Sequence, residues 1–567
     1  MKDKIQKIIS ALGGPASGWE KTLKDNVCDF SVEVPVDKNH GDYSTNVALI
    51  LAKKIGKNPV ETANLIKEKI GSNKLFSKIE IAGPGFINFF VKDKFFIDNL
   101  KKVDKNYGKG WELKSQKVIL DYTDPNPFKE FHVGHLMNNA IGESLSRIFE
   151  FQGAKVKRAC YQGDVGIHVA KALWGKMQKP DYTWGMAYAF GSKIYEESET
   201  SKKEIIELNK TIYNRSDEKV NKLYDEGKAD SLKHFDEIYK VLGTKFDYFI
   251  FESETGEIGK KIVEKGLKDG VFEKGDNGAI IFKGEKVGLH TRVFINSEGL
   301  PTYGAKDLAL AEVKYKKYKY DKSVVVTAVE QNSYFEVMLT AMKEINPKLA
   351  EKTKHIGHGM MRLPDGKMSS RTGNVITGES LLEKVEQLVQ KKIRDRELDE
   401  EEKEHIAQKV AVGALKYSIL KQSIGSDIIY DFNKSISFEG DSGPYLQYSY
   451  ARAESVLRKA KAESTRASFS PFGRSPVGGK KIKITQLEKA MSYFPDVVLK
   501  ASQNYQPNII ALYLTELASE FNAYYAKNKI VDKADEFSPY RVAVTSAFSK
   551  IMKNGLWLLG IEALEKM

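Results

Sequence analysis

Cysteine is nearly absent from the 567-residue sequence, in which only Cys28 and Cys160 occur. Two cysteines can form neither a disulfide scaffold nor a cysteine-rich zinc site, and this scarcity favours a reducing compartment. No hydrophobic run approaches the roughly 20 residues that a membrane-spanning helix needs. The first residues, Met1 to Ile5, lack the apolar core of a signal peptide. We therefore expect a cytoplasmic protein that does not enter a membrane.

The hydrophobic content of 41% is too high for a disordered chain, and 16 prolines with 44 glycines are ordinary for a folded one. At about 150 residues per domain, the length predicts three or four domains. The net charge of +13 favours an anionic partner such as nucleic acid, because a basic surface concentrates polyanions. Lysine-rich solvated surfaces are common, however, so the charge alone does not identify the partner.

Residues 1–108 have the pattern of a small α+β domain. Strands are predicted at 32–36 and 79–82, a Gly-Pro-Gly turn leads into the apolar segment 86–91, and helical spacing marks 47–55 and 60–70. Glycines at positions 108 and 110 then indicate a domain boundary.

From residue 109 to 395 strands alternate with helices, which predicts a parallel sheet with helical crossovers. Strands are expected at 117–122, 156–161 and 323–327, and a helix at 136–151. A charged stretch at about 175–290 is interpreted as an insertion that splits this α/β domain. Residues 396–567 are predicted to be helical, interrupted by a mobile basic loop at 461–483.

A first candidate site follows the strand that ends at Tyr122, where a proline-containing loop leads into His132-Val133-Gly134-His135 at the start of a helix. A helix N-terminus presents unpaired N–H groups and partial positive charge, and therefore attracts anions. His132 and His135 could donate to phosphate oxygens, and Gly134 leaves room for a base or ribose. Taken alone, the tetrapeptide could equally be two surface histidines near a helix start.

A second candidate lies far downstream, at Lys367-Met368-Ser369-Ser370-Arg371 between Gly366 and Gly373. Such a loop can bring an ammonium group and hydroxyls to a triphosphate, although in isolation it could be an ordinary basic surface loop. The presence of both segments in this order, within a split α/β domain, favours a nucleotide site.

These two segments resemble the signature motifs of class I aminoacyl-tRNA synthetases. Longer strings resemble the arginyl-tRNA synthetase family over essentially the whole chain: PNPFKEFHVGHL, YQGDVG, PTYGAKD, EQNSYF, GPYLQYSYAR and LGIEALEKM. The resemblance implies a multidomain α/β protein. Its parts would be an additional tRNA-binding domain at 1–108, a Rossmann-type catalytic domain at 109–395, and an all-α anticodon-binding bundle at 396–567.

The resemblance also implies the activity of an arginine–tRNA ligase. L-arginine and ATP would form arginyl-adenylate, and the arginyl group would pass to the 2′-OH of the 3′-terminal adenosine of tRNA-Arg. Mg²⁺ would bridge the phosphates without protein ligands, tRNA would be needed for the first step, and the protein would be a monomer. The implied catalytic residues are His132, His135 and Lys367, and ATP would also contact Lys129, Gly134, Met368 and Ser369.

One position departs from the family's loop pattern, because Ser370 stands where a second lysine is usual. Lys129, three residues before His132, is the candidate that would supply the missing positive charge. The alternative is a solvated loop lysine.

Recognition of arginine requires carboxylates that accept from a planar fork of N–H donors. Tyr303 and Asp307 share one face if residues 304–314 form a helix, and they match the family's arginine-binding Tyr and Asp. Asp121 matches a position that is more often Glu, while Asn126 and Gln331 match polar residues near the α-amino and carboxylate groups. The alternative for Asp307 is an acid on a helix surface.

Other features remain open. His168 could bind substrate or pack, and Lys314, Lys316, Lys317 and Lys319 could form a phosphate-binding strip. Tyrosines at 445, 448, 450, 524 and 525, interleaved with basic residues, could contact RNA or lie in a helical core. Two rival functions also remain, namely a class I synthetase for another amino acid and a catalytically silent RNA-binding paralogue.

Overall fold

The computed structural model of the chain describes residues 1–12, 30–364, 377–463 and 482–567. The predicted loop with Lys367, Met368 and Ser369 lies outside these residues, as does most of the basic segment 461–483. The chain divides into two compact units. One comprises Met1–Tyr107, Val456–Asp496 and Glu520–Ile551, and the other Gly108–Ser455, Val497–Ser519 and Met552–Met567.

The unit that contains the N-terminus is built on a four-stranded antiparallel sheet in the order β1-β2-β4-β3. Its strands are β1 (Val32–Glu33), β2 (Tyr43–Thr45), β3 (Phe76–Ala82) and β4 (Phe86–Val91), and its first helices are α1 (Lys2–Ser10), α3 (Val47–Ile55), α4 (Pro59–Ile70) and α5 (Asp93–Leu100). The predicted α+β character is confirmed. β1 is shorter than the predicted 32–36, in keeping with Pro35, which has no N–H to donate to a neighbouring strand.

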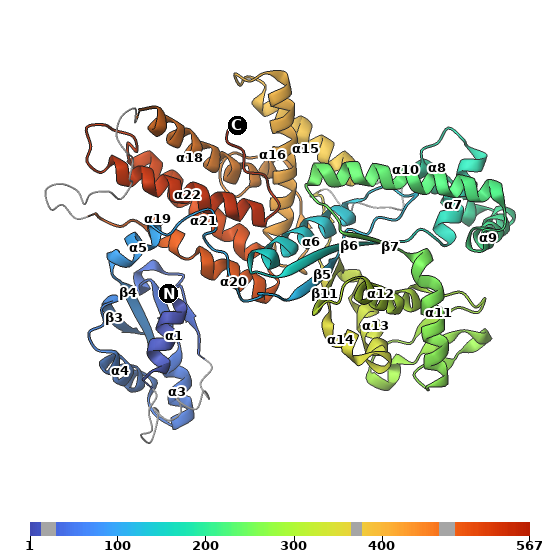
Figure 1. The fold of residues 1–567 in the computed structure, drawn as a ribbon, viewed down its shortest axis with the longest axis horizontal. Coiled ribbons are helices and arrows are strands. Elements are labelled where there is room, and N and C mark those ends of the chain that lie inside the picture. Colours follow the sequence, from blue (N-terminus) through green and yellow to red (C-terminus); the bar gives the residue numbers. More distant parts are fainter. Residues whose placement is uncertain (13–29, 365–376, 464–481) are drawn as a thin grey trace. The chain divides into compact units, whose positions relative to one another are not determined.

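The second unit contains a five-stranded parallel sheet in the order β12-β11-β5-β6-β7 (Figure 1). The strands are β5 (Lys117–Asp121), β6 (Lys155–Gln162), β7 (Tyr248–Phe251), β11 (Lys322–Ala328) and β12 (Thr353–His358). This order is that of a Rossmann-type sheet, as predicted, and the direction of strand addition reverses between β5 and β11. Ligands of such sheets bind beyond the carboxyl ends of the strands at this reversal.

The crossover helices of this sheet are α6 (Val133–Phe151), α7 (Ile167–Gln178), α11 (Glu252–Lys268), α12 (Tyr303–Lys317), α13 (Asn332–Ile345) and α14 (Pro347–Lys352). An apolar core that includes Ile119, Ala305, Phe335 and Met338 joins β5 to α12 and α13. These contacts fix α12 and α13 relative to the end of β5, where the site described below is formed.

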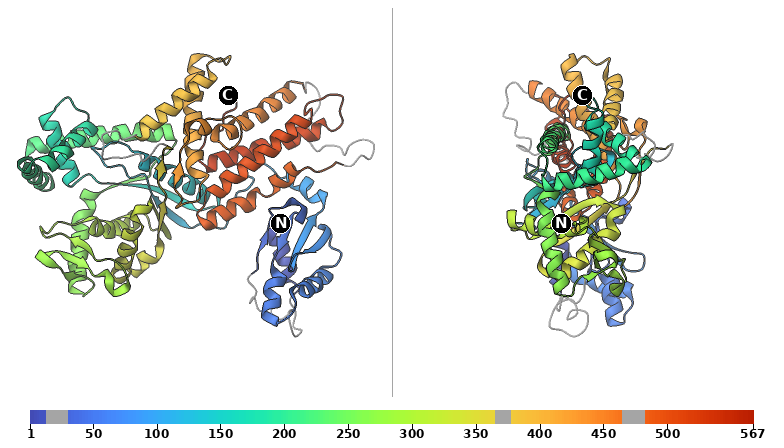
Figure 2. Two further views of the ribbon diagram at one scale, coloured as in Figure 1. Left: turned by 180° about the vertical axis from the view of Figure 1, so that it is seen from behind. Right: turned by 90° about the vertical axis from the view of Figure 1, so that its right-hand side faces the viewer.

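The region predicted as one insertion, about 175–290, is more complex than expected. It begins with the end of α7 and continues through α8 (Trp184–Glu197), α9 (Glu199–Asn214) and α10 (Glu218–Leu242), the long green helix of Figures 1 and 2. The chain then returns to the main sheet as β7, which pairs with β6. A small antiparallel sheet of β8 (Glu273–Lys274), β9 (Ile280–Phe282) and β10 (Arg292–Ile295) follows α11. The insertion is therefore interrupted by a strand of the main sheet.

The C-terminal part is helical, as predicted, with α15 (Gly378–Ile393), α16 (Glu400–Leu420), α17 (Phe432–Ser435), α18 (Gly443–Glu463), α19 (Gln486–Ser492), α20 (Phe494–Asn504), α21 (Asn508–Lys527) and α22 (Ser538–Leu558). Short strands β13 (Met361–Arg362) and β14 (Ile428–Ile429) pair in parallel. Of the tyrosines considered for RNA contact, Tyr450 and Tyr524 are buried. Within the described ranges, no helix combines the length and apolar character needed to cross a membrane.

A buried charge network supports the end of β5. Glu143 on α6 accepts hydrogen bonds from the hydroxyl of Tyr122 at 2.7 Å, from Arg147 at 2.6 Å and from Arg158 at 2.9 Å. The two guanidinium groups lower the pKa of Glu143, although its burial acts in the opposite direction. Because Tyr122 directly follows β5, the network anchors the point at which the chain enters the site.

Replacing Glu143 with Gln would leave two guanidinium groups facing a neutral amide. Breaking a buried ion pair costs about 3–5 kcal/mol, and we expect the lower value because both arginines keep some solvent contact. For a unit of this size the thermal unfolding midpoint should fall by about 4 °C in scanning calorimetry. Glu226→Gln, at an exposed side chain, is the matched control. A shift no larger than that of the control would contradict the assigned support.

Candidate active site

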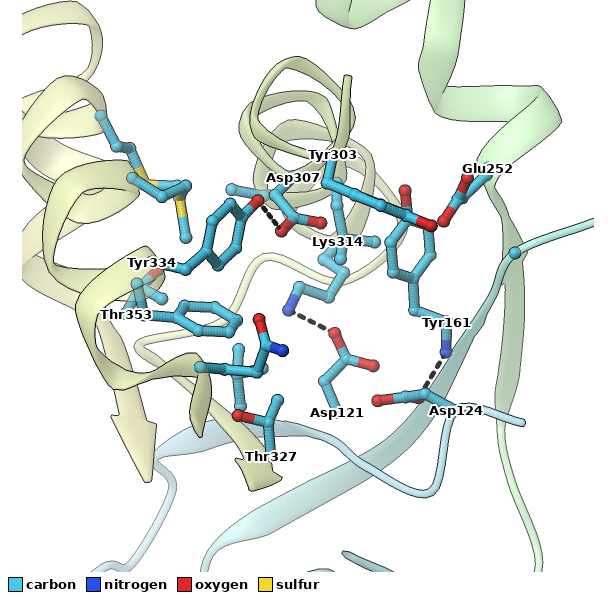
Figure 3. Close-up of a pocket in the computed structure, with 18 of the residues that line it drawn as sticks. Asp121, Asp124, Tyr161, Glu252, Tyr303, Asp307, Lys314, Thr327, Tyr334 and Thr353 are labelled. Carbon is cyan, nitrogen blue, oxygen red and sulfur yellow. Dashed lines mark hydrogen bonds and ion pairs between the residues drawn. The ribbon is translucent and has the colours of Figure 1, made fainter. Parts of the chain in front are cut away.

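A cavity of about 570 Å³ opens beyond the carboxyl ends of β5, β6, β7 and β11 (Figure 3). It lies at the reversal of strand order, where α/β sheets bind their ligands. The residues that the sequence predicts for arginine all line it, namely Asp121, Asn126, Tyr303, Asp307 and Gln331. The fold thus brings together residues that lie up to 210 positions apart in the chain.

Helix α12 supplies one wall of this cavity. Tyr303, Asp307, Leu310, Ala311 and Lys314 line it at spacings of three and four residues, so they share one face of the helix. The predicted helix and its shared face are therefore present.

Asp307 is held by the hydroxyl of Tyr334, which donates to its Oδ2 atom. Burial raises the pKa of Asp307 to about 7, against the lowering effect of this hydrogen bond. Nearby carboxylates, first Glu252 and then Asp121, raise the pKa further. A cation that entered the cavity would favour the ionised form of Asp307.

Asp121, the last residue of β5, forms an ion pair with Lys314 at 2.9 Å, and the side chains are only 1% and 2% exposed. Lys314 therefore does not belong to the predicted phosphate-binding strip, because its ammonium group lies inside the cavity. The Oδ1 atom of Asp121 is buried and has no hydrogen-bond partner among the described residues. This oxygen therefore lacks a hydrogen-bond donor.

Glu252 contributes a further carboxylate at the end of β7. It forms a buried ion pair with Lys306 of α12, whose ammonium group also lies 5.6 Å from the ring centre of Tyr303. Gly163 passes close beside Glu252, and a Cβ atom at that position would lie 2.6 Å from Asn126 and 3.0 Å from Glu252. A side chain at position 163 would therefore displace two residues of the cavity wall.

The loop after β5 is attached to the end of β6 by side chains. The backbone N–H of Tyr161 donates to Asp124 Oδ1 at 2.8 Å, and that of Gly163 donates to Asn126 Oδ1 at 2.8 Å. The loop has left-handed backbone angles at Thr123 (φ 81°) and Asp124 (φ 50°), which are uncommon outside glycine. These hydrogen bonds to β6 stabilise the unusual conformation.

The two histidines of the first motif stack on each other, with ring centres 3.5 Å apart. The backbone N–H of His132 donates to His135 Nδ1 at 3.1 Å. Because Nδ1 of His135 accepts, the proton of its neutral ring is on Nε2, which can donate to a ligand. A Cβ atom at Gly134 would lie 2.9 Å from the His132 ring, so this glycine accommodates the imidazole of His132, not only a base or ribose.

Both imidazoles are neutral at pH 7. Burial, followed by the positive charge of Lys129, lowers the pKa of His132 to about 4. Burial, His132 and Lys129 lower the pKa of His135 well below its ordinary value. The pair can therefore offer hydrogen bonds to an anion, while full positive charge must come from lysines. Lys129 itself lies with its ammonium group 4.8 Å from the ring centre of Tyr188.

Comparisons with known proteins agree over the whole chain. The family profile described as "tRNA synthetases class I (R), catalytic domain" matches residues 98–432, a "DALR anticodon binding domain" matches 446–567, and an "Arginyl tRNA synthetase N terminal domain" matches 1–91. The chain belongs to the arginyl-tRNA synthetase family.

Relatives in this family include the arginine–tRNA ligases of Clostridium kluyveri and Borreliella burgdorferi. The first is 32% identical over 96% of this chain and 97% of its own length, and the second is 30% identical over 100% and 99%. The structure of the Thermus thermophilus arginyl-tRNA synthetase has the same fold, with a TM-score of 0.78, 22% identity and full coverage of both chains.

Three residues that line the cavity were not singled out from the sequence, namely Asp124, Glu252 and Tyr334. Lys314 was considered for phosphate binding and not as the partner of an acid. Glu252 directly follows the apolar segment Tyr248–Phe251, so recognition of that strand would have placed an acid at its carboxyl end. Nothing in the sequence pairs Lys314 with Asp121. The Nε2–H of His168 donates to the Gly163 carbonyl oxygen at 2.9 Å, and His168 does not line the cavity.

The neutral state of the histidines can be checked by NMR titration of the ATP-free protein with labelled histidine. We expect the His132 signal, assigned with a His132→Asn variant, to titrate near pH 4 and to remain unchanged between pH 6 and 8. ATP should raise this pKa, because its anionic phosphates stabilise the imidazolium form. A midpoint near 6.5, the value of a solvated histidine, would contradict the buried environment.

Proposed function

We propose that the protein is an arginine–tRNA ligase. It would activate L-arginine with ATP to arginyl-adenylate and transfer the arginyl group to the 3′-terminal adenosine of tRNA-Arg. The carrying observation is one cavity in which the carboxylates of Asp121, Glu252 and Asp307 converge. The loop that follows Asp121 leads to His132 and His135, which do not themselves line the cavity. The names of relatives at 30% identity and above over nearly the full chain support the same activity.

The guanidinium group of arginine would lie against α12. Asp307 uses one oxygen for Tyr334 and would keep the other for a guanidinium N–H. Glu252, at the start of α11, lies on the same side of the cavity (Figure 3). The ring of Tyr303, over which Lys306 already lies, would cover the guanidinium plane. A lysine substrate, with a compact ammonium group, could not satisfy both separated carboxylates.

The other end of the substrate would face the loop that leads to His132. Asn126 has committed its Oδ1 atom to Gly163, so its NH₂ group remains as a donor to the α-carboxylate. Gln331, at the end of the 3₁₀ turn Val329–Gln331, would lie beside the same end. This orientation directs the carboxylate toward the helix that begins with the histidine pair.

In the first step a carboxylate oxygen of arginine attacks the α-phosphorus of ATP. The bond from that phosphorus to the bridging oxygen breaks, and pyrophosphate leaves with the electron pair. The nucleophile is already an anion, so no general base is required. Neutral His132 and His135 would donate hydrogen bonds to the phosphate oxygens, with Gly134 giving access, and Lys129 would add positive charge. In this proposal Lys367, Met368 and Ser369 also contact ATP; they lie outside the described residues.

In the second step the hydroxyl of the terminal tRNA ribose attacks the carbonyl carbon of the adenylate, and AMP leaves. We propose that residues 1–108 and 396–567 bind the tRNA, with the anticodon held by the helical part, and that 109–395 carry out catalysis. We also propose that the protein acts as a monomer in the cytoplasm.

Mg²⁺ is implied by the ATP chemistry, where it neutralises phosphate charge. Among the described residues no group of three or more His, Cys, Asp or Glu side chains could hold a metal ion. Two of the carboxylates that line the cavity, Asp121 and Glu252, are paired with Lys314 and Lys306. In this proposal Mg²⁺ is bound by the ATP phosphates, and none of the steps assigned to this chain depends on a protein metal site.

ATP–pyrophosphate exchange with a panel of amino acids, with and without tRNA-Arg, tests the proposed function. We expect exchange with arginine in the presence of tRNA. Exchange with a different amino acid would reassign the substrate, and no exchange under any condition would indicate a silent paralogue.

Replacing His135 with Ala removes the buried Nε2–H donor. Loss of one such donor typically costs about 10²–10³ in rate, so exchange with arginine should fall at least tenfold. Binding of labelled tRNA-Arg in a filter assay should stay within about twofold, because His135 is buried at the nucleotide end of the site. Unchanged exchange would refute the role of His135 in activation.

A further inference from the structure

Asp124 is a carboxylate of the cavity that the steps above leave unused. It lies in the left-handed loop three residues after Asp121, and its Oδ1 atom accepts the backbone N–H of Tyr161 at 2.8 Å. No described residue donates a hydrogen bond to its Oδ2 atom. The backbone contact fixes the direction of the side chain, and one oxygen remains free on the cavity side.

The free oxygen of Asp124 faces another free oxygen. Figure 3 shows the carboxylates of Asp121 and Asp124 pointing toward each other at the base of the cavity. Lys314 binds Oδ2 of Asp121, which leaves the buried Oδ1 atom without a partner among the described residues. Burial and then the charge of Asp121 raise the pKa of Asp124 well above its ordinary value. These two facing carboxylate oxygens therefore lack a cationic partner.

The group that completes such a pair must be cationic and must donate to two oxygens at once. A primary ammonium has three N–H donors directed to different sides and fits this requirement. Asn126 cannot replace the carboxylates well, because its Oδ1 atom already accepts the N–H of Gly163. In Figure 3, Asp307 and Glu252 lie at the opposite side of the cavity, where the guanidinium group is proposed to bind.

We propose that Asp124 positions the α-ammonium group of the amino acid, which donates to Asp124 Oδ2 and to Asp121 Oδ1. The inference rests on the proposed function and specifies how the same site selects an α-amino acid. Asp124 belongs to the loop that ends at His132, and the α-ammonium and the reacting carboxylate share one carbon atom. Holding the ammonium at Asp124 would therefore set the carboxylate beside the loop that leads to the histidine pair.

In this arrangement different carboxylates bind different groups of the substrate. Asp307 and Glu252 would select the guanidinium group, whereas Asp124 and Asp121 would select the α-amino group. Lys314 pairs with Asp121 and Lys306 pairs with Glu252, so each end of the substrate would meet one paired and one unpaired carboxylate. A guanidino acid that lacks the α-amino group would leave the two facing oxygens unsatisfied.

The test uses the full-length protein with tRNA-Arg and ATP. Asp124→Asn removes the charge but keeps an oxygen that accepts from Tyr161. We measure KM for arginine in ATP–pyrophosphate exchange, and Ki for 5-guanidinopentanoic acid, which is arginine without its α-amino group. A charge-assisted hydrogen bond contributes enough that KM should rise about tenfold to a hundredfold. Ki for the analogue should change less than threefold.

Asp247→Asn is the matched control. Asp247 also accepts a backbone N–H from β6, that of Arg158 at 2.9 Å, but it does not line the cavity. Both constants should stay unchanged in this variant. Asp124→Ser, which lacks the charge but retains a small acceptor, should repeat the selective loss. Because the ratio of KM to Ki does not depend on the fraction of active enzyme, partial unfolding would not hide the effect.

Two outcomes would overturn the inference. If KM and Ki rise in parallel, Asp124 lies at the guanidinium end. If both constants stay unchanged and only the thermal midpoint falls, Asp124 is a structural anchor of the loop. The unmodified protein separates these outcomes from failure of the proposed function. Arginine-dependent exchange in that protein must be present for the function to stand, whatever the behaviour of the Asp124 variants.

Discussion

Unbalanced negative charge inside one cavity is the constraint on which the rest of the site depends. The carboxylates of Asp121, Asp124, Glu252 and Asp307 converge there, and Lys314 and Lys306 each neutralise only one of them. Burying an uncompensated carboxylate is costly, and burial raises the pKa of Asp124 and Asp307 as a result. In the proposed function, a substrate with a positive charge at each end would relieve both costs, and the site would favour arginine over neutral amino acids.

The parallel sheet makes this concentration of charge possible. Asp121, Gly163 and Glu252 lie at or just beyond the ends of β5, β6 and β7, and α12 crosses the same edge with Tyr303, Asp307 and Lys314 on one face. Hydrogen bonds from Tyr161 and Gly163 hold the loop after β5 against β6. The Glu143 network secures the residue from which that loop starts. Each element therefore fixes one side of the cavity.

Local sequence patterns predicted much of this arrangement. Spacing of three and four residues indicated that Tyr303 and Asp307 share a helix face, and strand–helix alternation indicated a parallel sheet. Both are confirmed. The Lys314–Asp121 pair could not be predicted, because its members are 193 residues apart and a lysine on a helix is ordinarily solvated. β7 was missed because four apolar residues between charged segments resemble a helix turn as much as a strand. The stacking of His132 on His135 depends on space above Gly134, which no periodicity reveals.

The most direct measurement of the central claim compares binding of L-arginine and L-citrulline to the protein with ATP and tRNA-Arg. Citrulline has nearly the same shape, but a neutral ureido group replaces the guanidinium group. If unbalanced carboxylate charge selects the substrate, citrulline should bind at least roughly a hundredfold more weakly, since a buried acid would face an oxygen. Equal affinity for the two amino acids would contradict the account.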